Sequence, residues 1–420
     1  MRLLERALLT IALAAAFPVH ADTDISGVTV NQRWPWSEKV DVDFILTGDA
    51  SDVEITARWD GRTEPYPLAS IPSCLPGANR YTWDPSSSEF AGRVLTGFCI
   101  SVVPAPPDPQ RYLVVDLVNG GIDYLAGVPE GGWAADHKST KMVFRRIPKG
   151  TYALGISREE LGYIGTGGDP SSYSDRWGKR NVTFTNDFYV AIFKYTEAQH
   201  ACLTAGGGSS SCIPQKTTYY ELRGAPGDVN WPNTGYGVAA DSIVGKLRAK
   251  AGGLVVDLCE EEQWEVAARA GSTGFFPNGG TMADSHAVLS NLVSEAGAWF
   301  PDAGASIPAV GGYAPNAWGL YDVVGSGEEW VLDSVSSTVA NGSLPAGNLS
   351  DSTNPTGVQN SNGWSAYRII KGSSGNWASA RLYNMVLAAR WTRHPHYDSY
   401  ATRFCIHLSP LGDLTFPSAR

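Results

Sequence analysis

Charged residues are scarce in this sequence, and positive charge is the scarcer kind. They make up 18% of the 420 residues, with 32 lysines and arginines against 42 aspartates and glutamates. Binding to phosphate backbones requires a basic surface. The net charge of -10 therefore argues against a general nucleic-acid-binding function. The hydrophobic share of 43% is enough for a large folded core, and 46 glycines with 26 prolines favour many turns over a helical bundle.

Long apolar runs are missing after the first residues, so no membrane span is predicted. Residues 1–21 have the pattern of a secretory signal peptide. Arg2 and Arg6 give it a charged start, residues 7–17 are apolar, and residues 19–21 form a small-residue cleavage site. No cysteine follows this site, which argues against a lipoprotein anchor. We therefore expect a secreted or periplasmic protein.

Cysteine is rare too, and the six that occur suit an extracytoplasmic compartment. They allow three disulfides, although spacing alone leaves the connectivity open. Cys202 and Cys212 flank a flexible Gly/Ser loop that a disulfide could close. Cys74 and Cys99 lie within one predicted domain and form a second candidate pair. Cys259 and Cys405 then remain as the third pair.

Residues 22–103 alternate apolar and polar side chains at the period of β-strands. The alternation is clearest at residues 28–30, 40–46 and 53–59, and Asp60-Gly61 follows as a turn signal. This pattern predicts a small all-β sandwich of immunoglobulin-like type. It contains no catalytic constellation, so we interpret it as a spacer or docking domain. Residues 104–141 form a Pro-rich linker and a transitional segment that the sequence assigns to neither side.

Residues 311–330 combine five glycines, four aromatic residues and three carboxylates in one turn-rich passage. Residues 320–324 are apolar enough to predict a short buried strand. Four residues after the turn then mix carboxylates with unobstructed backbone carbonyls, which is the donor set that hard cations prefer. The alternative is a turn between strands with capping or solvated charges. The four residues are Asp322, Gly325, Gly327 and Glu329.

The same passage resembles the core motif of the formylglycine-generating, or sulfatase-modifying factor, family. The motif residues present are Pro315, Asn316, Gly319, Leu320, Tyr321, Asp322, Gly325, Glu329 and Trp330, with Ser326 in place of the usual Asn. Further blocks match at residues 142–152, 182–199, 258–271 and 403–405. The resemblance covers residues 142–408, leaves 409–420 as a tail, and implies an α+β fold of C-type-lectin-like type. Helices are predicted from a cap at Asp241 to Lys250 and over residues 260–270, where three glutamates favour the helix start.

The resemblance also implies two structural calcium sites. One falls on Asn291, Leu292 and, after a loop of different length, Asp302. The other falls on Asp322, Gly325, Gly327 and Glu329. Calcium would hold together loops that are too irregular to order themselves.

The family's copper-dependent oxidases use two cysteines near the C-terminus, and both are missing here. Their positions are occupied by Trp377 and Leu382, neither of which binds copper or acts as a redox thiol. No copper is therefore expected, and formylglycine generation by the known route is not expected either. The sequence also has no nucleophile elbow, phosphate-binding loop or His-Glu-x-x-His motif. Whether the chain is an enzyme stays open.

The C-terminal stretch is instead rich in the aromatic, arginine and histidine side chains that dominate binding surfaces. We predict a non-catalytic, calcium-stabilised module that binds a protein or glycan, and the stretch 377–403 is a candidate for diversification by a retroelement. Some of these side chains would be core residues. The predicted ligand-binding residues are Trp377, Tyr383, Asn384, Arg390, Trp391, Arg393, His394, His396, Tyr397 and Tyr400.

The rival hypothesis is a metal-dependent oxidoreductase of the same family that acts on a protein or small-molecule thiol. His394, His396 and Asp398 are the closely spaced residues that would offer metal ligands. Exposed loop histidines are the simpler explanation.

Overall fold

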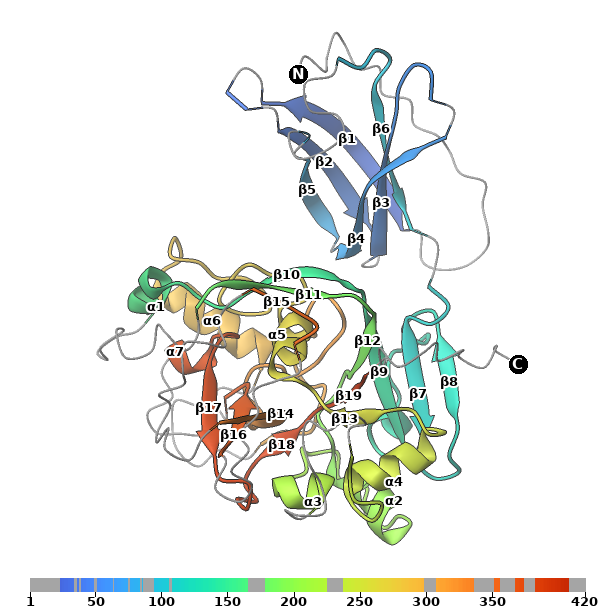
Figure 1. Cartoon of the computed structure of the whole chain (residues 1–420), viewed down its shortest axis with the longest axis vertical. Helices are drawn as coiled ribbons and strands as arrows, with labels where there is room; N and C mark the ends of the chain where they lie inside the picture. Colours follow the sequence, from blue (N-terminus) through green and yellow to red (C-terminus); the bar gives the residue numbers. More distant parts are fainter. Residues whose placement is uncertain are drawn as a thin grey trace. The chain divides into compact units, whose positions relative to one another are not determined.

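The computed structural model describes most of the chain and divides it into two compact units, Met1–Pro107 and Asp108–Arg420 (Figure 1). The predicted signal peptide (residues 1–21), the tail (409–420), Asp302 and Trp377 lie outside the described residues. The described residues are 23–33, 36–37, 39–48, 51–62, 64–74, 76–83, 85, 94–105, 108–164, 178–224, 237–297, 307–335, 351–355, 367–373 and 382–407.

The first unit is built from two antiparallel sheets of three strands, so the all-β prediction is confirmed. Val40, Val42, Phe44 and Leu46 alternate into the core between the sheets, as the strand period requires. One sheet contains β1 (Asp24–Gln32), β2 (Val40–Thr47) and β5 (Gly77–Trp83) in that order. The other contains β4 (Tyr66–Cys74), β3 (Ser51–Arg58) and β6 (Cys99–Pro104).

The pairing of Cys74 with Cys99 is wrong. Cys74 lies opposite Ser51 and Cys99 lies opposite Arg58, at the two ends of β3. At about 3.3 Å per residue these ends are roughly 23 Å apart, whereas a disulfide needs Cα atoms within about 7 Å. Both cysteines are unbonded.

The second unit is centred on a six-stranded sheet with the order β13-β19-β12-β9-β7-β8 (Figure 1). The transitional segment that the sequence left unassigned supplies two of its strands, β7 and β8, and β7 pairs with β9. This segment therefore belongs to the second unit. The strands are β7 (Tyr112–Asp116), β8 (Ile122–Leu125), β9 (Lys141–Ile147), β12 (Phe188–Ala191), β13 (Val256–Leu258) and β19 (Phe404–Ile406).

Two smaller sheets and seven α-helices complete the described part of this unit, which confirms the α+β prediction. One sheet has the order β17-β16-β14-β18, from β17 (Arg390–Arg393), β16 (Tyr367–Lys371), β14 (Glu329–Val335) and β18 (Ala401–Thr402). The other has β10 (Gly150–Leu154), β11 (Arg180–Phe184) and β15 (Ser352–Thr353). The helices are α1 (Arg158–Ile164), α2 (Glu197–Ala205), α3 (Tyr219–Arg223), α4 (Ile243–Lys250), α5 (Glu261–Arg269), α6 (His286–Ala296) and α7 (Leu382–Met385), with a 3-10 turn at Ala135–Lys138.

Helix starts follow the expected cap chemistry, with one correction. Thr196 caps α2 and forms a reciprocal capping box with Gln199. For α4 the cap is Ser242 and not Asp241, because the Ser242 hydroxyl accepts the Gly245 N–H at 3.1 Å. The helix therefore begins one residue later than predicted.

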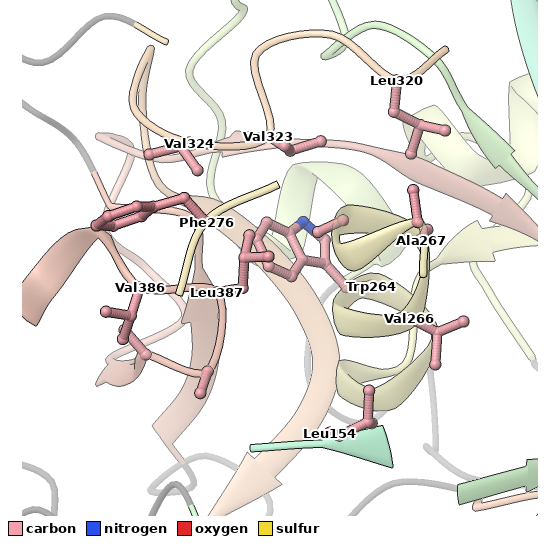
Figure 2. Close-up of a cluster of buried hydrophobic side chains, with 14 of the residues drawn as sticks. Leu154, Trp264, Val266, Ala267, Phe276, Leu320, Val323, Val324, Val386 and Leu387 are labelled. Carbon is pink, nitrogen blue, oxygen red and sulfur yellow. The ribbon is translucent and has the colours of Figure 1, made fainter. Parts of the chain in front are cut away.

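The largest apolar cluster of the second unit surrounds Trp264 of α5. Figure 2 shows the indole extending from the helix toward Phe276 and Leu387, with Val323 on its other side. These residues come from segments that are far apart in sequence. Burying them joins α5, the segment before β14 and the segment after α7 into one core.

Of the two disulfides predicted within the second unit, one is present and one is not. Cys259 and Cys405 are bonded, with Cα atoms 4.9 Å apart, and link the end of β13 to β19 across 146 residues of chain. Cys202 and Cys212 are unbonded: their thiols donate to the carbonyls of Ser139 and Ser210. Among the described residues, no helix is long and apolar enough to cross a bilayer.

Candidate functional site

The passage 311–330 forms an irregular connection into β14 that is mostly buried from Asn316 onward. No strand forms at residues 320–324, contrary to the sequence prediction. Asp322 and Ser326 have φ angles of 55° and 54°, and Gly325 and Gly327 have 72° and 101°. Because left-handed backbone interrupts the pleat, the chain cannot pair here and begins pairing only at Glu329.

Asn316 fixes this passage to the end of α5. Its amide nitrogen donates to the carbonyls of Ala267 and Ala268 at 2.7 and 3.0 Å. Its side-chain oxygen accepts the N–H groups of Trp318 and Leu320 at 3.1 and 3.0 Å. One buried amide thereby satisfies carbonyls at a helix end and closes the turn that precedes Asp322.

Glu329 is fully buried and has hydrogen-bond donors on both oxygens. Oε1 accepts from Nζ of Lys194 at 2.6 Å, and Oε2 accepts from the Trp264 indole N–H at 2.8 Å. The Arg403 guanidinium contacts both oxygens at 3.2 and 3.3 Å. Burial disfavours the charged carboxylate, but Arg403 and Lys194 outweigh burial, and the pKa of Glu329 lies below its ordinary value.

Lys194 and Arg403 also satisfy carbonyls of the surrounding backbone. Nζ of Lys194 donates to the Gly327 carbonyl at 2.7 Å, and Lys194 is 0% exposed. Arg403 donates to the carbonyls of Ala191 and Ile192, both at 2.8 Å, and to that of Tyr321 at 2.7 Å. Neither role is predicted from the sequence. For Lys194 a signal existed, since it is the single charge in the apolar run 188–195.

Asp322 lies in the same buried region with one oxygen engaged. Oδ2 accepts the Gly311 N–H at 2.7 Å, while Oδ1 has no hydrogen-bond partner among the described residues. Burial raises the pKa of Asp322, against the opposing effects of the Gly311 bond, Lys194 and Arg403. The Ser326 hydroxyl is likewise buried without a described partner.

The two predicted calcium sets have different surroundings, and calcium binding stays a prediction. In the first, Asn291 and Leu292 lie within α6, Asn291 is exposed, and the Leu292 carbonyl accepts from Asn278 at 2.9 Å. In the second, the oxygens of Gly327 and Glu329 already hold the ammonium of Lys194. Within the described ranges, no three His, Cys, Asp or Glu side chains gather as a metal site.

Leu382, which the family resemblance predicts at the position of the second cysteine, is apolar and packed. Leu382 begins α7 and lies partly buried against the core around Trp264. A leucine side chain in this position supplies neither a thiolate for copper nor a thiol for exchange with a substrate.

The predicted ligand-binding residues divide into buried and accessible groups. Arg390 and Tyr400 are buried, at 2% and 8% exposure. Tyr397 is 49% exposed and His396 is exposed, while the remaining described members are partly buried. Those partly buried residues are Tyr383, Asn384, Trp391, Arg393 and His394.

The buried arginine belongs to a charge cluster that the sequence analysis did not find. Arg390 pairs with Glu261 of α5 at 2.6 Å, and Lys371 lies 3.5 Å from the same carboxylate. Glu262 faces Arg180 at 3.4 Å, and Asp333 accepts the Glu261 backbone N–H at 2.7 Å. All three glutamates of this helix start are buried, and Glu261 and Glu262 pair with cations from distant strands. Glu260 is the N-cap residue. No local pattern in the sequence signals the two ion pairs.

The loop between β17 and β18 carries the accessible residues on a fixed backbone. Tyr219 N–H donates to the Pro395 carbonyl, Thr217 N–H to that of Tyr400, and Ala401 N–H to that of Glu328. On the loop, the rings of His394 and His396 lie 4.1 Å apart, and those of His396 and Tyr397 lie 4.7 Å apart.

Beneath the loop, an arginine joins β17 to the core aromatics. Arg393 donates to the Tyr400 hydroxyl at 2.6 Å, and the Tyr400 ring packs edge-on against Trp330. A loop held at both ends and from below presents its side chains with little ordering left to do on binding.

Comparison with known proteins agrees with this architecture. The family model of the sulfatase-modifying factor enzyme 1-like domain matches residues 134–399, more than half of the chain. No curated protein matches. Among solved structures, the chain is similar to Treponema denticola variable protein 1, with 14% identity and a TM-score of 0.42 over 63% of this chain and 95% of that one. It is also similar to CarF, with 13% identity and a TM-score of 0.30 over 62% and 99% of the two chains. The chain belongs to the family of proteins with a sulfatase-modifying factor enzyme 1-like domain.

Proposed function

We propose that this protein is an extracytoplasmic, non-catalytic binding module that uses its C-terminal surface to hold a protein or glycan. The observation that carries the proposal is the pairing of two features in one domain. An apolar, packed Leu382 stands where the family's second catalytic cysteine would be. Aromatic and basic side chains lie close by in sequence, on a strand and loop that the fold holds in place.

The proposed contact surface, called the β17 surface, consists of Trp391, Arg393, His394, His396 and Tyr397. Its rings offer broad apolar faces, and its imidazole, guanidinium and phenol groups offer hydrogen bonds. Such side chains supply contact area at low conformational cost, which is why they dominate binding hot spots. Arg390 and Tyr400 are excluded from the surface, because both are buried and support it from below.

A binding screen tests this proposal directly. A glycan array and a displayed peptide library would be probed with the purified protein and with the double variant His396→Ala, Tyr397→Ala. We expect the double variant to lose binding to selected ligands by at least about tenfold while its melting temperature stays unchanged, because both side chains are exposed. The matched control is Tyr163→Ala, which removes an exposed tyrosine from α1 and should leave binding intact. Ligands that bind the double variant as well as the wild type would overturn the proposal.

Diversification of this surface by a retroelement is a narrower form of the same proposal. It requires a near-copy of the coding stretch for residues 377–403 close to the gene, differing mainly at adenines. Sequencing the genomic region around the gene tests this. If no such copy is found, diversification by a retroelement is ruled out, while the binding proposal itself still stands.

The rival oxidoreductase makes a different prediction. It requires stoichiometric iron or copper in the purified protein and oxygen uptake with a protein or small-molecule thiol. Elemental analysis by mass spectrometry and an oxygen electrode measure both. Metal-dependent oxygen uptake by the wild type that is lost in His396→Ala would favour the rival, because His396 is one of its three candidate metal ligands. The calcium prediction for Asn291, Leu292 and Asp302 is part of the proposal and is read from the same elemental analysis.

A further inference from the structure

Lys194 lies within the second predicted calcium set. Its ammonium lies 2.6 Å from Oε1 of Glu329 and 2.7 Å from the carbonyl oxygen of Gly327. Both residues are members of the oxygen set that the family resemblance assigns to calcium. Since both contacts are to acceptors, Nζ donates in each, and a positive charge is supplied there by the chain itself.

The charges around this ammonium are already largely balanced. Two buried cations, Lys194 and Arg403, face two buried carboxylates, Asp322 and Glu329. One further buried carboxylate, Glu328, interacts with both Lys194 and Arg393. Bringing a divalent cation into the same place beside Lys194 would therefore add more positive charge than the remaining carboxylate can neutralise. In a buried site such an excess is expensive, because water cannot screen it.

The hydrogen bonds of the candidate ligand oxygens also argue against calcium. Calcium takes six to eight oxygen ligands, and Glu329 and Gly327 are two of the four residues predicted to supply them here. Both oxygens of Glu329 accept from Lys194, Trp264 or Arg403, and the Gly327 carbonyl accepts from Lys194. The residues as they stand fit an ammonium and do not fit calcium.

Some acceptor capacity nevertheless remains. Oδ1 of Asp322 and the hydroxyl of Ser326 are buried without hydrogen-bond partners among the described residues. Both residues stand in the left-handed backbone that wraps this region. The segment 322–329 therefore contains two buried oxygen atoms that Lys194 does not contact and that a metal ion could bind.

We propose that the ammonium of Lys194 replaces the second structural calcium ion, and that removing it uncovers a latent calcium site formed by Asp322, Ser326, Gly327 and Glu329. The built-in cation neutralises Glu329 at the start of β14, which pairs with β18 at the end of the loop that carries the β17 surface. The passage 322–329 is therefore held in place at any calcium concentration.

The test compares the wild type with Lys194→Met, which removes the charge and keeps most of the side-chain volume. Calcium per chain is measured by native mass spectrometry, and melting temperature is measured with EDTA and with excess calcium. We expect Lys194→Met to bind one calcium more than the wild type. In EDTA its melting temperature should fall by roughly 10 °C, because the buried Glu329 carboxylate loses one of its two cations, and calcium should restore part of the loss.

Lys371→Met is the matched control. Lys371 is also 0% exposed and paired with glutamates, which keep Arg390 and Arg269 as partners just as Glu329 keeps Arg403. Unlike Lys194, it pairs with no member of the predicted calcium sets. It should lose stability without gaining a calcium ion or a calcium response. Counting the gain relative to the wild type separates this site from the predicted set at Asn291, Leu292 and Asp302.

Two results would overturn the inference. One is equal calcium stoichiometry in the wild type and Lys194→Met. The other applies even if the variant does not fold: wild-type crystals soaked in calcium would show anomalous scattering from an ion between Asp322 and Glu329. A wild-type crystal with Nζ of Lys194 in that position and no ion supports it. Neither outcome depends on whether the β17 surface binds a ligand.

Discussion

Asp333 shows how strongly burial changes a single side chain of this protein. It is 1% exposed on β14 and faces Glu261 and Glu262 across the start of α5. Burial, followed by the two glutamates, raises the pKa of Asp333 to about 8. The folded protein therefore holds a proton near neutral pH that the unfolded chain, with a carboxyl pKa near its ordinary value, releases.

This raised pKa predicts a pH-dependent effect of Asp333→Asn. Between the ordinary carboxyl pKa and about pH 8 the native state binds more protons than the unfolded state, so Asp333 contributes less stability as pH rises. Asparagine is neutral at every pH and keeps an oxygen for the Glu261 N–H. We expect the variant to gain stability relative to the wild type from about pH 5 to about pH 8, by at most about 1.4 kcal/mol per pH unit, and then level off.

Urea unfolding of both proteins across this range is the measurement. Taking the difference between them cancels other titrations, including that of His407, whose pKa burial lowers to about 4. A difference in unfolding free energy that stays constant with pH would show that Asp333 is ionised in the folded protein.

At the scale of elements, the start of α4 shows which of two neighbouring polar residues caps a helix. Sequence rules rate Asp241 and Ser242 alike as caps. Ser242 accepts the Gly245 N–H at 3.1 Å and donates to the Ala239 carbonyl at 2.7 Å, whereas Asp241 precedes the cap. We expect Ser242→Ala to lower the free energy of unfolding by about 1 kcal/mol, because a helix N–H loses its acceptor.

Asp241→Ala is the control, and it should change stability by less than about 0.5 kcal/mol. Chemical denaturation of the two variants decides between the residues. A larger loss in Asp241→Ala would restore Asp241 as the cap and contradict the structure.

At the scale of the whole molecule, the Cys259–Cys405 disulfide links parts of the second unit that are 146 residues apart in the chain. Closing so long a loop removes many conformations from the unfolded state, so losing the bond should cost on the order of 4 kcal/mol. We expect the double variant Cys259→Ala, Cys405→Ala to lower the melting temperature of the second unit and to leave that of the first unit unchanged. Calorimetry of the two transitions measures this.

The matched control is Cys202→Ala with Cys212→Ala, a pair that is unbonded in the structure. It removes no cross-link and should shift the second transition much less. An equal shift in the two double variants would mean that Cys202 and Cys212 are also bonded in solution.

The sequence predicted the strands and helices whose signals are local. The alternation at residues 40–46 predicted β2, and the motif from Pro315 to Trp330 predicted the fold of the second unit. It failed at residues 320–324, where an apolar run suggested a strand. The left-handed residues from Asp322 to Gly327 exclude one, and apolar content does not report φ.

The sequence by itself determined the family and the all-β character of the first unit. It also has Trp377 and Leu382 where the family resemblance predicts the two cysteines. Each of these depends on residue identity or on a short-range period. Only the tertiary structure decided which charges meet: Lys194 with Glu329 and Arg390 with Glu261. Such pairs join segments more than a hundred residues apart, and their energy depends on burial, which no local pattern encodes.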